Sequence, residues 1–172
     1  STYETTETII LSPSSTVNGT LSSSDPVNIS ITDDDQKPTV SFALSSESID
    51  ENSSSDVILT ATLSAATEAT TTIEYSLSGT AESSEYTITD SPITIAAGTT
   101  TGTATISTNG KDDTVVEVTE TIILTFGTLT NATTSTTDVT LNLTSDDKPS
   151  VTLSYDPITF NENGDCLLYT SD

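Results

Sequence analysis

The sequence predicts an all-β protein built as an immunoglobulin-like antiparallel β-sandwich of about seven strands, in a tandem array. Short apolar runs alternate with polar residues at a period of two, and turn residues separate these runs. No segment has a convincing helical period. The sequence also repeats itself, because "TTETIIL" at 5–11 returns as "VTETIIL" at 118–124. Seven short strands within one long repeat are typical of a sandwich domain.

The repeat predicts where the domains begin and end. A second pair of segments, 32–52 and 144–163, matches with a similar offset of about 111 to 113 residues. We therefore expect the C-terminal part of a first repeat at 1–36, a complete repeat at 37–147 and the start of a third at 148–172. The tail 164–172, "GDCLLYTSD", departs from the pattern. It is either an ordinary strand containing Cys166 or a translated sequencing adapter, and we assign Cys166 no function.

Each strand of the complete repeat is predicted from its alternation and from the turn residues beside it. The expected strands are 39–45 with a continuation at 48–51, then 56–64, 72–78, 92–96, 100–108, 118–127 and 137–145. Side chains two apart share a face, so each strand supplies an inward row. The predicted core is Val40, Phe42, Leu44, Val57, Leu59, Ala61, Leu63, Ile73, Tyr75, Leu77, Ala104, Ile106, Ile122, Leu124, Phe126, Val139, Leu141 and Leu143.

The charge of the chain narrows its possible partners. Of 172 residues, 26 are acidic and only three are Lys, with no Arg or His, which gives a net charge of −23. Nucleic acid and anionic membrane surfaces both require basic patches, so neither is expected as a partner. No apolar stretch approaches the 18 residues of a membrane span, and we expect no direct membrane insertion here. A cation is the natural partner.

Strand topology predicts that the acidic segments meet at one end of the sandwich. We expect the first strand to pair with the second, the second with the fifth, and the third with the last two, all antiparallel. The link at 108–118, the start of the next strand and the end of the last strand then lie together. The corner at Glu51 and the loop carrying Glu85 reach the same end.

Such a cluster requires neutralisation. At roughly 5 Å and an effective dielectric of about 20, one pair of like charges costs on the order of 3 kcal/mol. A domain is stable by only about 5–15 kcal/mol, so several such pairs could offset most of that margin. Ca²⁺ takes about 6–8 oxygen ligands from flexible loops, whereas Mg²⁺ demands a tight octahedron and zinc prefers His or Cys. The alternative is that the acidic loops are simply solvated.

Several motifs together resemble the Calx-beta family. They are "VSF" at 40–42 with "IDEN" at 49–52, "GTAESSEYT" at 79–87, "ITIAAGTTTGTATI" at 93–106, "DDTVVEVTETIILTF" at 112–126 and "TSDDKP" at 144–149. This resemblance covers the whole complete repeat. It implies calcium ligands at Glu51, Glu85, Asp112, Asp113, the carbonyl of Val115, Glu117, Glu120, Asp146 and Asp147.

The flanking parts keep fragments of the same pattern. The first repeat has Glu4, Glu7, Asp33, Asp34 and Asp35, and the third has Glu162. The loop with Glu85 is one residue shorter than the family pattern, and the closing run has two acids where three are common. We therefore expect fewer or weaker ions than the fullest sites of the family hold.

The expected function is a calcium-binding structural or adhesion module of an extracellular or cell-surface repeat protein. Calcium ions and neighbouring repeats are its expected partners, and a surface ligand or cell is a possible one. The alternative is a calcium sensor that regulates an attached membrane transporter or enzyme. An enzymatic role is not expected, because the chain has no His and its single Cys lacks catalytic partners.

Overall fold

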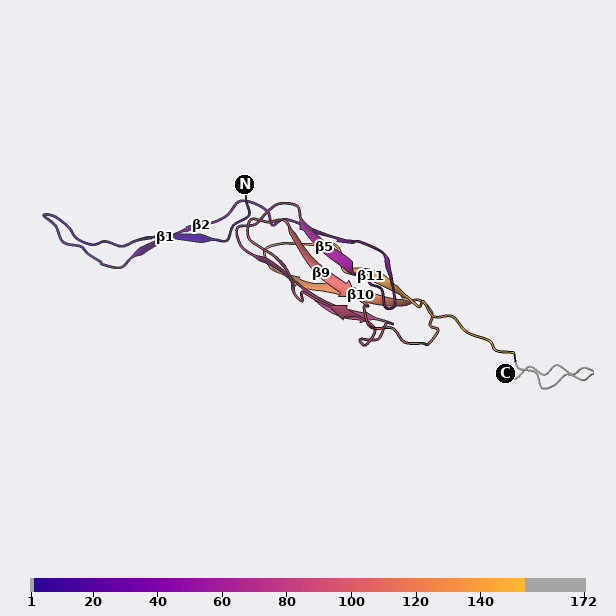
Figure 1. Ribbon diagram of the computed structural model, residues 1–172. Coiled ribbons are helices and arrows are strands. Elements are labelled where there is room, and N and C mark those ends of the chain that lie inside the picture. The colour runs from indigo at the N-terminus through magenta and orange to yellow at the C-terminus, as the bar shows by residue number, and fades with distance from the viewer. Residues whose placement is uncertain (1, 154–172) are drawn as a thin grey trace, which may run out of the picture.

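The computed structural model describes residues 2–153, and their ordered elements are all β-strands. Most of these strands form two facing sheets, and a separate hairpin projects from one end of the sandwich (Figure 1). Residues 145–153 leave from the other end (Figure 1). No helix in the described part of the chain could cross a membrane. The prediction of an all-β sandwich is confirmed.

The first sheet has four strands in the order β3-β5-β9-β7. These strands are β3 (Val40–Leu44), β5 (Val57–Leu63), β9 (Thr101–Ser107) and β7 (Thr87–Ile88). The second sheet has five strands in the order β4-β11-β10-β6-β8. They are β4 (Ser48–Asp50), β11 (Asp138–Thr144), β10 (Glu120–Leu129), β6 (Thr71–Gly79) and β8 (Ile93–Ile95).

The pairing agrees with the sequence prediction except at the third predicted strand, β6, which pairs with β10 but not with β11 and has β8 on its other side. Strand β3 pairs with β5, β5 with β9, β6 with β10 and β10 with β11, all antiparallel. Strand β4 adds to the edge of the second sheet by a parallel pairing with β11, between Ile49 and Leu143 among others. The first predicted strand is therefore divided between the two sheets, because its continuation at 48–50 crosses from one to the other.

The core lies between the two sheets and contains most of the predicted inward rows. The residues with the lowest exposure include Leu59, Ile73, Ile106, Ile122, Leu124 and Leu141. Phe42 and Phe126, from opposite sheets, stack with their ring centroids 3.6 Å apart. Buried side chains from both inner faces are typical of aligned sandwich packing.

One predicted core residue is wrong, and one strand was missed. Leu77 is 40% exposed, although its partner across the ladder, Leu124, is fully buried. Strand β8 flanks β6 only as far as Ile73, so the distal half of β6 has no neighbour on that side. The missed strand is β7, whose two residues are too few to establish an alternating pattern. Strand β10 also begins at Glu120 and not at 118.

The projecting hairpin consists of β1 (Glu7–Leu11) and β2 (Val27–Ile31), which form a two-stranded sheet. Its base contacts the sandwich through a bridge between Tyr3 and Thr67 and through the Glu68 N–H, which donates to the Tyr3 carbonyl at 3.2 Å. The Lys37 ammonium lies 5.8 Å from the centre of the Tyr3 ring. These contacts join the hairpin to the end of the sandwich opposite Glu51.

Candidate metal centre

Carboxylates from five segments gather at one end of the sandwich, and we call this set the acidic pole. It consists of Glu51, Glu85, Asp112, Asp113, Glu117, Glu120, Asp146 and Asp147. Three groups of three carboxylates each offer oxygen atoms within 4.8 Å of one another, and Glu51 belongs to all three. The groups are Glu51–Glu85–Glu117, Glu51–Asp113–Asp147 and Glu51–Asp112–Asp146. The predicted convergence is therefore present, with Glu51 at its centre.

Backbone and hydroxyl contacts hold Glu51 in place. Its N–H donates to the Thr144 carbonyl at 3.0 Å, which ties the corner to β11. The hydroxyl of buried Thr108 donates to the Asp50 carbonyl at 2.7 Å and accepts from the Ser53 N–H at 3.1 Å. Thr108 follows β9, so one hydroxyl connects the corner to the start of the link that carries Asp112 and Asp113. Glu51 is therefore fixed at a junction of both sheets.

The link between β9 and β10 is joined to the same corner. Asn52 adopts a left-handed backbone with φ of 53°, and its side-chain oxygen accepts from the Gly110 N–H at 3.0 Å. Asn tolerates this conformation better than most residues. Further along, the Val115 N–H donates to an oxygen of Asp113 at 2.6 Å, which folds the loop back on itself. These turns place Asp112 and Asp113 beside Glu51.

The loop that carries Glu85 begins at a position where only glycine fits. Gly79 has φ of +124°, and a Cβ there would lie 2.0 Å from the Thr121 carbonyl oxygen. The Thr80 and Ala81 N–H groups donate to that same oxygen at 3.0 and 3.1 Å. The Glu85 side chain then accepts from the Glu82 N–H. The close contact between β6 and β10 thus directs the loop across the pole.

Burial without a partner distinguishes Glu51 from an ordinary surface carboxylate. The residue is only 5% exposed, and its Oε2 is buried with no hydrogen-bond partner. Desolvation raises the pKa of Glu51 to about 7, with further contributions from Glu117, Asp113 and Asp147. Every charged neighbour that shifts this pKa is another carboxylate. A buried polar atom without a partner calls for an explanation.

Two other carboxylates at the pole also have raised pKa values. Asp147 has a buried, unpartnered Oδ2, and desolvation together with Asp112 and Asp146 raises its pKa. Desolvation and the neighbouring Glu85 raise the pKa of Glu120. Within the pole, Glu120 interacts with Glu85 and belongs to none of the three groups around Glu51. The Val115 side chain is 56% exposed, and the expected role of its carbonyl remains a prediction.

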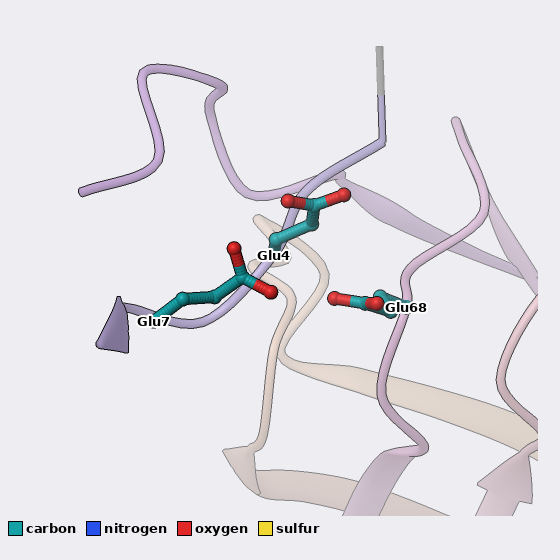
Figure 2. A group of neighbouring side chains, drawn as sticks. All are labelled: Glu4, Glu7 and Glu68. Atoms are coloured by element: carbon teal, nitrogen blue, oxygen red, sulfur yellow. The ribbon is translucent and has the colours of Figure 1, made fainter. Parts of the chain in front are cut away.

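A second acidic group lies at the base of the hairpin, and we call it the joint cluster. Glu4, Glu7 and Glu68 each offer an oxygen within 4.8 Å of the others, and Figure 2 shows their carboxylates converging from two separate chain segments. The Glu4 N–H also donates to Asp33 at 2.7 Å. Glu68 raises the pKa of Glu4, with smaller contributions from desolvation, Glu7, Asp33 and Asp35.

The predicted first-repeat residues are therefore partly brought together. Asp33, Asp34 and Asp35 each offer an oxygen within 4.8 Å of the others, and Asp33 and Asp35 also raise the pKa of Glu4, which belongs to the joint cluster with Glu7. Glu162, predicted for the third repeat, and Cys166 lie outside the described residues.

Sequence reasoning missed Glu68 and Glu82. Glu68 lies in the β5–β6 loop, at the end of the sandwich opposite Glu51, so no motif marked it. The predicted topology could have indicated Glu68, because the β5–β6 loop lies at the end of the sandwich where the preceding segment of the chain enters. Glu82 raises the pKa of Glu120, and it stands only three residues before the predicted Glu85.

The donor set of the acidic pole fits a hard divalent cation. All the side chains that converge there offer carboxylate oxygens, from loops rather than from one rigid element. Ca²⁺ accepts such irregular oxygen sets at 2.3–2.6 Å. The two orphaned oxygens on Glu51 and Asp147 are the kind of atoms that an ion would satisfy.

Comparisons with known proteins show no close relative. No family model matches the chain, and no curated protein matches it. Among solved structures, the chain is similar to "Crystal structure of the S-layer protein SbsC domains 4 and 5", with 14% sequence identity and a TM-score of 0.34. That match covers 82% of this chain and 69% of the other. A similarity at this level carries no argument about function, so the fold class rests on the strands and sheets themselves.

Proposed function

We propose that this chain is a calcium-binding structural module of an extracellular or cell-surface repeat protein. The observation that carries the proposal is the Glu51 carboxylate, which is buried, lacks a partner for Oε2 and is surrounded by other carboxylates. Without a cation, this arrangement has to hold protons or lose stability at neutral pH. A bound divalent cation would neutralise these carboxylates, so the site would neither have to hold protons nor lose stability.

Glu51 would be the shared ligand at the pole. It belongs to three groups of converging carboxylates, so Asp113 with Asp147, and Asp112 with Asp146, are its natural co-ligands. Glu85 and Glu117 would complete the set on the other side, with Glu120 supporting Glu85. The ion supplies positive charge and fixes loop geometry, and no chemical step is required of it. A ligand set made only of oxygen atoms favours calcium over zinc.

Calcium at the pole would also stiffen the exit of the chain. Asp146 and Asp147 are separated from the end of β11 only by Ser145, and they precede Lys148 and Pro149. Pro restricts its own backbone and that of the residue before it, so little freedom would remain between the ion and the next segment. This fits a tandem array with units at 1–36, 37–147 and 148–172, in which calcium makes successive units a stalk or an adhesion surface.

The joint cluster would be a weaker position for the same ion. Its three carboxylates are more exposed than Glu51, so the cost of leaving them without a cation is smaller. Glu68 comes from the complete sandwich, whereas Glu4 and Glu7 come from the hairpin segment (Figure 2). An ion there would tie the two parts together across their joint.

Thermal melting tests the proposal. The chain is unfolded in excess calcium and in chelator, with magnesium as the control ion. Calcium at about a hundredfold excess over its dissociation constant adds about 2.7 kcal/mol, which is a shift of several degrees for a domain of this size. An unchanged melting temperature would count against calcium binding.

Calorimetric titration then identifies the role. Extracellular calcium modules bind at about 10⁻⁴–10⁻³ M and sensors at about 10⁻⁷–10⁻⁵ M. We expect the weaker range for the pole, because a structural ion is held at extracellular calcium concentrations. A submicromolar constant would favour a sensor over a stalk.

A further inference from the structure

The β1–β2 hairpin has an apolar face that nothing in the described chain covers. The side chains of one face alternate along both strands and are close to half exposed. They are Ile9 at 46%, Leu11 at 54%, Val27 at 58%, Ile29 at 45% and Ile31 at 45%. Contiguous apolar surface of this kind is uncommon on a soluble protein and marks an interaction site.

The last hairpin of the sandwich, β10–β11, shows what normally covers such a face. The two hairpins share one register, because Glu7 pairs with Ile31 in the first as Glu120 pairs with Leu143 in the second. Their inward faces are nearly the same. Ile9, Leu11 and Val27 match identical residues at Ile122, Leu124 and Val139, while Ile29 and Ile31 match Leu141 and Leu143.

In β10–β11 these matched positions form the centre of the core. Ile122, Leu124 and Leu141 have no exposed surface, and Leu143 has 1%. The facing sheet β3-β5-β9-β7 covers them, and β6 pairs along the free edge of β10. The same residue pattern is therefore fully buried once those strands are present.

We infer that the β1–β2 hairpin docks on a second sandwich body of this same fold, one that has strands equivalent to β3–β9 and lacks a final hairpin of its own. That body would lay a sheet over Ile9 and Ile29 and pair a strand with the free edge of β1. A second copy of this chain does not fit the role, because its own β10–β11 already fills that place. This inference does not depend on calcium.

The direct test supplies the missing body. An extended chain carries a copy of residues 37–115 immediately before Tyr3, so that the hairpin follows strands equivalent to β3–β9. Hydrogen exchange is measured at the amides of β1 and β2 in the parent and the extended chain, with sedimentation to establish the oligomeric state. We expect the extended monomer to exchange these amides at least about 100-fold more slowly than the parent.

A matched pair of variants makes this test specific to the apolar face. In the extended chain, Ile29→Asp should abolish the protection of β1 and β2, while Ser30→Asp, on the opposite face of the same strand, should preserve it. Unchanged exchange in the extended chain would overturn the inference. So would protection in the parent chain that rises with protein concentration, because a second copy would then be the occupant.

A reciprocal exchange keeps the inference testable should the extended chain fold poorly. The double variant Leu141→Ile and Leu143→Ile gives the mutually paired part of β10–β11 the inward face of β1–β2, while Phe126 beyond it is kept. Volume-conserving changes of this kind are tolerated best in cores. We expect one cooperative transition, with a melting temperature within about 10 °C of the parent. Loss of cooperative unfolding would show that the hairpin face cannot complete such a body.

Discussion

The acidic pole and the joint cluster derive from matching sequence but differ in burial. Glu4 and Glu7 of the joint cluster correspond to Glu117 and Glu120 at the pole, because they precede and begin the matching strands β1 and β10. The pole also has the corner with Glu51, which is 5% exposed, whereas the joint cluster has the exposed Glu68 in its place. Both regions gather carboxylates, and the buried, unpartnered carboxylate of Glu51 is what the joint cluster lacks.

This difference predicts that the two regions depend on calcium unequally. A buried, unpartnered carboxylate destabilises the folded state more than one in contact with water. Neutralising it with a cation therefore restores more folding stability. The pole should therefore dominate the calcium dependence of folding stability. The joint cluster should affect mainly how the hairpin and the sandwich are held together.

The largest expected effect is from Glu51→Gln. Glutamine keeps the shape of the side chain but cannot bring a negative charge to the three groups that share Glu51. We expect the variant to lose most of the calcium-dependent stabilisation, about 2.7 kcal/mol at about a hundredfold excess of calcium over its dissociation constant, while its stability in chelator stays equal or rises. Melting curves with calcium and with chelator measure both quantities.

The matched control for that variant is Glu74→Gln, on the exposed side of β6 and outside both clusters. It should keep the full response to calcium. A Glu51→Gln protein that responds to calcium as strongly as Glu74→Gln would remove Glu51 from the centre of the site.

The next effect is on the pH dependence of stability. Glu51 has a pKa of about 7 in the folded protein against an ordinary value of 4.5, so the folded state binds the extra proton between these pH values. Stability in chelator should therefore fall as pH rises from about 4.5 to 7, by about 1–3 kcal/mol after solvent screening. Denaturant unfolding across this pH range, with and without calcium, measures the slope.

Calcium should abolish or reverse that slope, because the ion replaces the proton. Glu51→Gln should flatten it in chelator. A parent protein in chelator whose stability rises steadily over the same range would contradict the assignment of a raised pKa to Glu51.

A comparable effect on stability is expected from Thr108→Val, which alters a contact that only the pole possesses. The change removes the hydroxyl that donates to the Asp50 carbonyl and accepts from the Ser53 N–H. Both backbone groups would keep only the longer bond between them, from the Ser53 N–H to the Asp50 carbonyl at 3.3 Å, and losing the two hydroxyl bonds should cost about 1–3 kcal/mol in total. Calcium affinity should fall as well, because the corner that carries Glu51 is loosened. Chemical unfolding and calorimetry measure the two effects, and unchanged calcium affinity would show that the corner is not needed to position Glu51.

The smallest effect is from Glu68→Gln at the joint cluster. The change removes the carboxylate that raises the pKa of Glu4, and because Glu4 and Glu68 are in contact with water we expect only a small change in unfolding free energy. The weakest calcium-binding step in a titration should disappear, while the response of the pole is unchanged. Loss of the main calcium response in this variant would reverse the ranking of the two regions.

The sequence predicted much of the fold because its strands are long and alternate clearly. Strands β5, β9 and β11 were placed within one residue at each end, and the pairing order followed from antiparallel topology. The exposure of Leu77 was not predictable from alternation, since it depends on how far β8 extends along β6. Strand β7 is held by its pairing with β9 and has no local signal.

The convergence of the acidic segments was predictable from the antiparallel topology, whereas the central position of Glu51 among them was not. Topology alone brought the five segments to one end. It could not distinguish Glu51 from its neighbours, because the corner that carries Glu51 is held by Thr144, which bonds to Glu51, and by Thr108, which bonds to Asp50 and Ser53, and both are far away in the sequence. Glu68 was missed because its neighbours Glu4 and Glu7 belong to another part of the chain.

The most direct test is a crystal structure of the chain grown in calcium, with anomalous scattering used to locate the ion. The proposal predicts an anomalous peak at the acidic pole, about 2.3–2.6 Å from an oxygen of Glu51. It also predicts Asp147 among the ligands, because its Oδ2 is the other orphaned carboxylate oxygen there. A well-ordered pole with no anomalous peak at several millimolar calcium would contradict the proposal.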